Sequence, residues 1–169
     1  MLSSFALSPA RILYARSMKR PACSAALFAL AAMFCFAAET TDPWPSSAVL
    51  EPAALAQILE KGKPPMVISV AFPVLYHAKH IVHAVEAGPG SKPEGIEALK
   101  KAVAGVPKDA DIVVYCGCCP MVKCPNIRPA YRTLHELGYT HVRVLDVPTN
   151  MHDDWYAKNY PSEDGKEGK

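Results

Sequence analysis

The chain has 169 residues, half of them apolar, which is enough for one well-buried domain and too short for two of ordinary size. Its formal charge is +2, but four of the 18 basic residues and none of the 16 acidic residues precede residue 39. The rest of the chain is therefore mildly acidic and has no basic cluster, which argues against a nucleic-acid-binding protein.

Residues 1–38 have the three parts of a secretory signal peptide. A basic stretch ends at Lys19-Arg20, an apolar run covers 25–38, and small residues precede the expected cleavage site at the end of that run. The run is shorter than the ~20 residues that cross a bilayer as a helix, so membrane contact is expected only through an uncleaved leader. We therefore predict an exported protein, either periplasmic or secreted.

After the leader, residues 39–47 are expected to form a polar linker, 48–161 one domain, and 162–169 a disordered tail. Strand and helix patterns alternate in the domain, which favours a mainly parallel sheet covered by helices on both faces. In chain order, the predicted elements are a strand at 49–50, a helix that opens at 51–52 and stops at Gly62, a strand at 66–71, a short helix at 73–80, a short strand at 81–85, a helix at 93–104, a strand at 111–116, a helix at 129–137, a strand at 141–147 and a short helix around Trp155.

The four cysteines that follow the leader lie within nine residues, at Cys116, Cys118, Cys119 and Cys124. Disulfide frameworks of small secreted domains scatter their cysteines, whereas one cluster suits a catalytic thiol, a redox pair or a metal site. Cys116 ends the most apolar strand, and ligands of parallel sheets bind at the carboxyl ends of strands. Loop amides and a helix N-terminus at that place would lower the pKa of a thiol.

Several segments occur in an order that is typical of one family. They are the strand VVYC that ends at Cys116, a loop, a helix that ends in L-x-x-x-G-Y at 134–139, the segment VRVL, Trp155, and Tyr160-Pro161, preceded upstream by KHIVHA at 79–84. In this order the body of the chain resembles a rhodanese-like domain, and its CGCCPMVKCPNIRP segment looks like a cysteine-rich subgroup of exported members. The chain departs from the family at several positions; in the second strand, Ser69 and Ala71 stand where the family usually has an aspartate and an arginine.

The resemblance implies an α/β fold with a five-stranded, mainly parallel sheet, and it implies sulfur transfer. Cys116 would be the nucleophile that carries sulfur as a persulfide, with Gly117, Cys118 and Cys119 forming an amide cradle around it. Arg128 would bind an anionic donor such as thiosulfate. The expected partners are a small sulfur donor or thiol acceptor and an exported protein, with no cofactor and no metal.

Two other interpretations of the cysteine cluster remain open. In a thiol–disulfide redox protein, Cys116 would attack and Cys119 or Cys124 would resolve the mixed disulfide. In the other, the protein would be a binding module that has kept the fold without catalysing a reaction, and the altered second strand favours this interpretation.

A soft-metal site is the third alternative, because thiolates suit zinc or cuprous copper. In this interpretation the candidate ligands are the four cysteines and the histidines of the segment His77-x-x-His80-x-x-His83. The adjacent pair Cys118-Cys119 argues against it, since neighbouring cysteines seldom both bind one tetrahedral ion.

Overall fold

The computed structural model describes residues 42–165, so the predicted signal peptide and the start of the predicted linker lie outside the described residues. The helices are α1 (Pro52–Glu60), α2 (Pro73–Ala78), α3 (Pro93–Ala102), α4 (Ile127–Glu136) and α5 (Met151–Asp154), with short 3-10 turns at Ser46–Ala48, Met121–Lys123 and Tyr156–Lys158. The strands are β1 (Val49–Leu50), β2 (Met66–Ser69), β3 (His80–Ile81), β4 (Val85–Glu86), β5 (Ile112–Tyr115), β6 (Val142–Leu145) and β7 (Ser162–Glu163). No helix in this part of the chain is long and apolar enough to cross a membrane.

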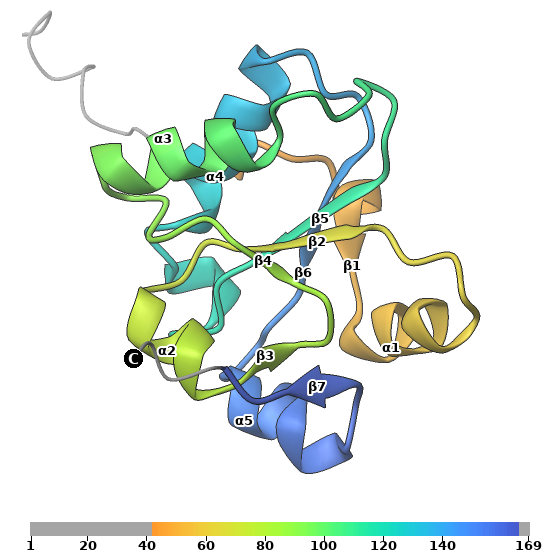
Figure 1. Ribbon diagram of the computed structural model, residues 1–169. Coiled ribbons are helices and arrows are strands. Elements are labelled where there is room, and N and C mark those ends of the chain that lie inside the picture. Colours follow the sequence, from red (N-terminus) through yellow and green to blue (C-terminus); the bar gives the residue numbers. More distant parts are fainter. Residues whose placement is uncertain (1–41, 166–169) are drawn as a thin grey trace, which may run out of the picture. The chain divides into compact units, whose positions relative to one another are not determined.

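Five strands form one sheet in the order β1-β6-β5-β2-β4, with β5 at its centre (Figure 1). Every neighbouring pair is parallel, and Val114 of β5 lies between Ile68 of β2 and Val144 of β6. All four residues of β5 are buried, as expected for an interior strand of a parallel sheet. The predicted α/β fold with a five-stranded sheet is confirmed.

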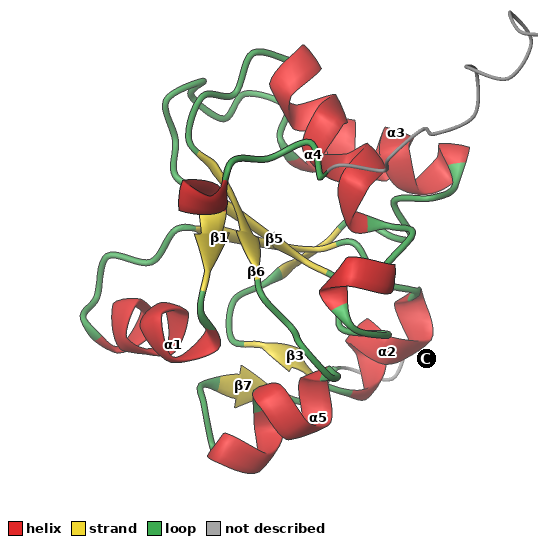
Figure 2. Cartoon of the chain, turned by 180° about the vertical axis from the view of Figure 1, so that it is seen from behind, coloured by secondary structure: helices red, strands yellow, loops and turns green. Residues whose placement is uncertain are grey.

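Helices cover both faces of this sheet (Figure 2). Successive side chains of a strand point to opposite faces, so each interior strand contributes to two cores. On one face, Val114 packs in a cluster with Leu134 of α4 and with residues of α3. On the other face, Val113 packs with Leu55 of α1 and with residues around α5. The strands are therefore fixed from both sides, and the loop after β5 starts from a rigid base.

The predicted strand at 81–85 is wrong, because two separate strands flank a turn there. β3 ends at Ile81 and β4 begins at Val85, and His83 between them has a φ of 58°. A residue in this left-handed region breaks the extended run. As a result β4 joins the main sheet beside β2, while β3 pairs with β7 in a separate two-stranded sheet.

The prediction of a disordered tail from residue 162 is wrong for its first residues. Ser162–Glu163 form β7, antiparallel to β3, with Glu163 opposite His80. The Glu163 carboxylate accepts a hydrogen bond of 2.8 Å from the His83 N–H, and its Oε1 lies 3.2 Å from Nε2 of His80. The charge of this residue indicated solvent exposure, but it has specific partners on β3 and on the turn that follows.

The end of the predicted linker packs against the domain. Trp44 is buried, and its ring lies edge-on to Tyr131 of α4 with 5.4 Å between the ring centroids. The Asp42 carboxylate lies 2.5 Å from the Arg128 guanidinium. We expected this polar, proline-bearing segment to be solvated. Its one large aromatic side chain is buried instead, because the burial of aromatic surface is favourable.

Candidate functional site

Cys116 follows β5 directly, at the carboxyl end of the central strand, and is only 2% exposed. The next residue, Gly117, has a φ of 72°, and a Cβ at this position would clash with the side chain of Met151. Only glycine adopts such a backbone without strain and leaves room for the neighbour. The chain therefore turns sharply after the strand, with the sulfur of Cys116 at the base of the loop.

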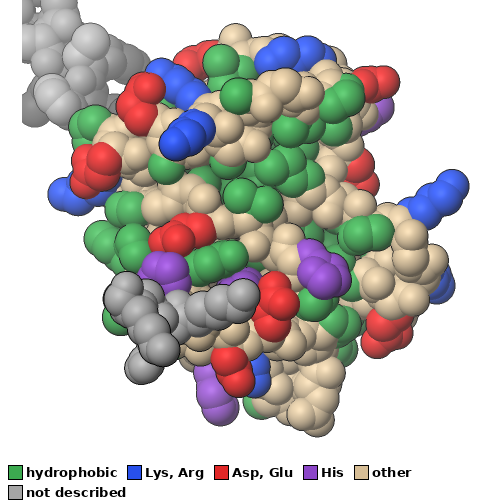
Figure 3. Space-filling view, in the orientation of Figure 1, with side chains coloured by type: hydrophobic (Ala, Val, Ile, Leu, Met, Phe, Trp, Pro, Cys, Tyr) green, Lys and Arg blue, Asp and Glu red, His purple; other side chains and the backbone are tan. Residues whose placement is uncertain are grey.

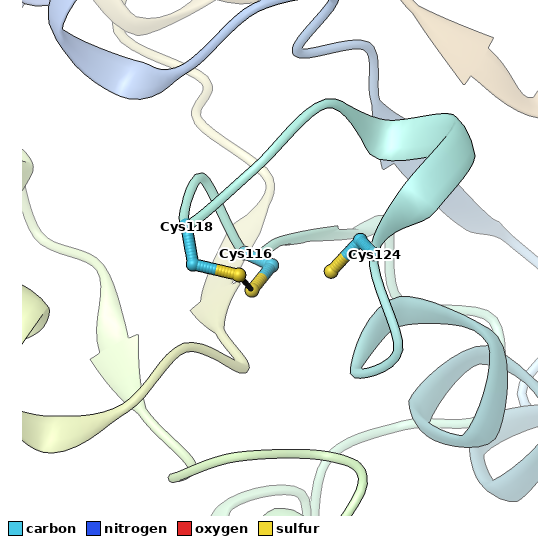
Figure 4. A group of neighbouring side chains, drawn as sticks. All are labelled: Cys116, Cys118 and Cys124. Atoms are coloured by element: carbon cyan, nitrogen blue, oxygen red, sulfur yellow. Dashed lines mark hydrogen bonds between the residues drawn. The ribbon is translucent and has the colours of Figure 1, made fainter.

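The loop brings the thiols of Cys118 and Cys124 close to Cys116 and places that of Cys119 beside Cys118. The Sγ atoms of Cys116 and Cys118 are 3.2 Å apart, and those of Cys118 and Cys119 are 3.3 Å apart. The sulfurs of Cys116, Cys118 and Cys124 all lie within 4.8 Å of one another. Figure 4 shows the Cys118 side chain pointing at Cys116, while Cys124 approaches from the far end of the loop. Cys116 and Cys124 are buried, whereas Cys118 is exposed.

Asn126 holds the base of the loop through its side chain. It is fully buried, its Nδ2 donates a hydrogen bond of 3.2 Å to the Cys116 sulfur, and its Oδ1 accepts one of 3.0 Å from the Ser91 N–H. Asn126 is the residue before α4, where asparagine commonly caps the helix with its own side chain. No such cap is present here, because the amide group is directed to the thiol instead.

Cys116 and Cys124 form a pair in which the ionisation of each thiol affects that of the other. The nearby Cys116 thiol, together with the N–H groups of Asn126 and Ile127, lowers the pKa of Cys124 to about 6. The same neighbour, together with burial, raises the pKa of Cys116, since two adjacent thiolates would repel each other. The side chain of Asn126 and the amide of Cys118 act in the opposite direction and favour charge on Cys116.

A cavity of about 250 Å³ opens beside Cys116. Its walls come from β2, α2, the end of β5 and the region of α5, and they include Ser69, Tyr115, Gly117 and Met151. Among the cysteines of the described chain, Cys116 alone lines this cavity. Cys116 is therefore the one cysteine among residues 42–165 that borders this cavity.

Arg128 lies outside the lining of this cavity. Its guanidinium donates hydrogen bonds to the carbonyl oxygens of Val122 and Cys124, at 3.0 and 3.1 Å, and pairs with Asp42. The arginine thus ties the cysteine loop to the segment before β1. The basic residues that do line the cavity are Lys79 and His152.

The profile of the rhodanese-like domain matches residues 51–147, which is more than half of the chain. The chain belongs to the rhodanese-like family. The resemblance inferred from the sequence is confirmed at this level, and the matched segment contains β5, the whole cysteine loop and α4.

Solved structures share this rhodanese-like fold. The Alr3790 protein from Anabaena sp. is 24% identical with a TM-score of 0.54, over 70% of this chain and 94% of that one. The polysulfide-sulfur transferase from Wolinella succinogenes is 20% identical with a TM-score of 0.51, over 71% and 80% of the two chains. The thiosulfate sulfurtransferase from Pseudomonas aeruginosa is 22% identical with a TM-score of 0.52, over 70% of this chain and 20% of that one. Curated proteins include no significant match.

The candidate ligands of the alternative metal-site interpretation are only partly brought together in this rhodanese-like domain. The sulfurs of Cys116, Cys118 and Cys124 are the one close group of at least three candidate ligands among residues 42–165. Of the predicted histidines, His77 faces Glu86 at 3.5 Å and His80 faces Glu163, so these two are engaged with separate carboxylates. A thiophilic ion would find three sulfurs here, without histidine.

Several residues of the site were not found from the sequence. The signal for Asn126 was a polar residue between Pro125 and an amphipathic helix, but this pattern indicates a helix cap as readily as a ligand. Tyr115 was expected in the core or at a rim, and it is buried with its hydroxyl accepting the Ile81 N–H at 3.3 Å. The predicted amide cradle is represented by the amide of Cys118, which donates to the Cys116 sulfur.

On the face shown in Figure 3, basic and acidic side chains are interspersed over the surface.

Proposed function

We propose that this protein is an exported sulfurtransferase that moves sulfane sulfur through a persulfide on Cys116. The observation that carries the proposal is the position of Cys116, which ends the central strand of a rhodanese-like domain and lines the cavity. The fold is shared with a polysulfide-sulfur transferase and a thiosulfate sulfurtransferase, which supports the same class of chemistry.

In the loading step, the sulfur of Cys116 attacks the sulfane sulfur of a donor in the cavity. A new sulfur–sulfur bond forms on Cys116, the donor's bond to its sulfane sulfur breaks, and the electron pair of that bond leaves with the rest of the donor. As this bond forms, the proton of Cys116 passes to the adjacent Cys124 thiolate. The negative charge of the pair thereby moves to the sulfur that reacts.

The surroundings of Cys116 favour an anionic sulfur at this place. The Asn126 side chain and the Cys118 amide donate hydrogen bonds to it, and both donors are fixed before the reaction begins. Lys79 is the candidate cation for an anionic donor, in place of Arg128, because it lines the cavity. In the second step a nucleophilic acceptor takes the outer sulfur and restores the Cys116 thiol.

Export is proposed on the basis of the leader, in which a basic stretch precedes an uninterrupted apolar run. Recovery of a shortened chain from the periplasm or medium of the native host, with an N-terminus near residue 38 or 39, would support it. An intact chain in the cytosol would contradict it.

The test of the sulfurtransferase is the amount of sulfite or alkyl thiol that the reduced protein displaces from thiosulfate or from an alkyl persulfide. The wild-type protein is expected to displace one equivalent in its first turnover, whereas Cys116→Ser displaces none because a hydroxyl lacks the acidity and nucleophilicity of a thiol. Val122→Ala is the control, since this side chain is 65% exposed and has no part in the proposed reaction. Displacement by Cys116→Ser that equals the wild type would refute the assignment.

A further inference from the structure

Cys116 borders the cavity, and its sulfur also has an exposed thiol as a neighbour. Cys118 has no part in the lining of the cavity. The Cys118 sulfur lies 3.2 Å from the Cys116 sulfur, and Cys118 is exposed (Figure 4). The turn at Gly117, with its φ of 72°, brings these two side chains together across a single residue.

Displacement at a sulfur atom needs the attacking and leaving groups on opposite sides of that atom. The Cys118 sulfur is already 3.2 Å from the Cys116 sulfur, which becomes the inner sulfur of the persulfide. Attack by Cys118 on this inner sulfur makes the outer sulfur the leaving group. The reaction therefore requires the outer sulfur to lie on the side of Cys116 away from Cys118.

From this arrangement we infer that Cys118 resolves the persulfide on Cys116 and releases its outer sulfur as hydrosulfide. The inference rests on the proposed function and specifies its product and its partner. The Cys118 sulfur forms a bond to the Cys116 sulfur, the bond between the inner and outer persulfide sulfurs breaks, and the outer sulfur departs with that electron pair and the Cys118 proton. Two thiols are oxidised to a disulfide, and one sulfane sulfur is reduced to hydrosulfide.

The first turnover needs no other reagent, and repeated turnover needs a reductant of the dithiol class. Such a partner must reach one sulfur of the Cys116–Cys118 disulfide, and the exposed position of Cys118 allows this. Exposed disulfides are the ones that are exchanged most readily. Cys124 and Cys116 are both buried, so a disulfide between them would offer the reductant no exposed sulfur.

The experiment is a single turnover of the fully reduced protein with one equivalent of thiosulfate or of an alkyl persulfide, in the absence of reductant and oxygen. Thiosulfate leaves as sulfite when it gives up its outer sulfur, so sulfide that is released with this donor comes from the protein-bound persulfide. The wild-type protein is expected to release one hydrosulfide, to lose the mass of two hydrogens, and to yield a peptide in which Cys116 is joined to Cys118.

The Cys118→Ser variant is expected to gain one sulfur atom, to keep it, and to lose sulfide release. The Cys119→Ser variant is the matched control, because it removes the neighbouring thiol but leaves the contact of Cys118 with Cys116, and it is expected to release sulfide. Addition of dithiothreitol should restore repeated turnover of the wild type.

Three outcomes would overturn the inference while leaving the sulfurtransferase in place. They are a wild-type protein that retains the added sulfur without releasing sulfide, equal sulfide release by Cys118→Ser, and a disulfide that joins Cys116 to Cys119 or Cys124. If neither the wild type nor Cys118→Ser takes up sulfur or displaces the rest of either donor, the proposed function fails, and the inference fails with it.

Discussion

Cys116 and Cys124 divide two properties of a reactive thiol between them. Cys124 is the sulfur whose negative charge is stabilised by N–H groups at the start of α4, but it is fully buried. Cys116 meets the cavity, but its own ionisation is opposed by its neighbour. Reactivity at Cys116 therefore depends on the pair as a unit, because the charge of one residue can move to the other by transfer of a single proton.

Replacement of Cys124 by serine should shift the pH dependence of Cys116 reactivity. In the wild type, the pair acquires its charge near pH 6, the lowered pKa of Cys124. In Cys124→Ser that low-pKa site is lost, so the acid limb should move up by at least about one pH unit. The measurement is the rate of Cys116 alkylation by iodoacetamide against pH, followed by peptide mass. An unchanged limb near pH 6 would show that Cys116 ionises without Cys124.

The Asn126 side chain accepts a hydrogen bond from the Ser91 N–H and donates one to the Cys116 sulfur. Two substitutions separate the effects of these two hydrogen bonds. Asn126→Ala leaves the Ser91 N–H without its acceptor, and it should cost about 1–3 kcal/mol of unfolding free energy. Asn126→Asp keeps an acceptor for that N–H but replaces the donor to Cys116 by a negative charge. Because a nearby like charge disfavours a thiolate, Asn126→Asp should load sulfur roughly tenfold or more slowly at neutral pH.

Urea unfolding and the rate of sulfur uptake distinguish the two effects of Asn126. A positioning role requires Asn126→Asp to lose more rate than stability. If both variants lose rate only in proportion to their loss of stability, the side chain supports the loop and does not act on the sulfur.

At the scale of elements, the pairing of β7 with β3 depends on the ionisation of Glu163. The His83 N–H, followed by the nearby His80, holds the pKa of Glu163 below its usual range. The ionised carboxylate therefore stabilises the fold, fully so above the usual glutamate pKa, and this stabilisation is lost as the pH falls through the lowered value. The acid side of the stability profile should thus include the release of β7.

Glu163→Gln should lower the unfolding free energy at roughly pH 7 and have less effect at a pH below the lowered pKa of Glu163, where the carboxylate is protonated in both states. The loss should be below about 1 kcal/mol, because the Glu163 side chain is 43% exposed and its interactions are screened. Glu97→Gln is the matched control, since Glu97 pairs with Lys100 on an exposed helix face. A loss that is equal at both pH values would contradict the mechanism.

The elements that could be predicted are those whose apolar pattern is complete within the segment. β5 and β2 are continuous apolar runs, and α4 has a clear apolar stripe, so sequence periodicity was sufficient. β7 consists of one serine and one glutamate, and it exists because β3 offers it partners from elsewhere in the chain. Such two-residue pairings carry no local signal.

The candidate site was predictable to a similar degree. Cys116 was found because strand and loop are consecutive in the sequence, so its place at the strand end follows from local pattern. The site residues from other segments, Asn126 and the cavity residue Ser69, could not be ranked, because their positions depend on how the helices pack on the sheet.

At the scale of the whole molecule, Trp44 anchors the segment before β1 to α4. The Trp44 ring contacts the Tyr131 ring, and the Arg128 guanidinium lies 5.6 Å from the centroid of the Trp44 ring. Trp44→Ala should lower the unfolding free energy by about 3 kcal/mol, the low end for a buried tryptophan, because this side chain lies at the edge of the core. Val74→Ala, at a position 73% exposed, should change it by less than about 0.5 kcal/mol. Equal effects in urea unfolding would show that the segment does not belong to the folded unit.

The pairing of β1 with β6 has a consequence for the kinetics of folding. Val49 lies opposite Val144, so the sheet is complete only when residues from near the two ends of the domain have met. Contacts between such distant positions slow folding, because the entropy of closing the intervening chain is lost before they form. During that interval the loop has not yet fixed the positions of the four thiols relative to one another. In an oxidising compartment, the yield of active protein should therefore depend on a reductant or disulfide isomerase that removes wrong pairings before the strands close.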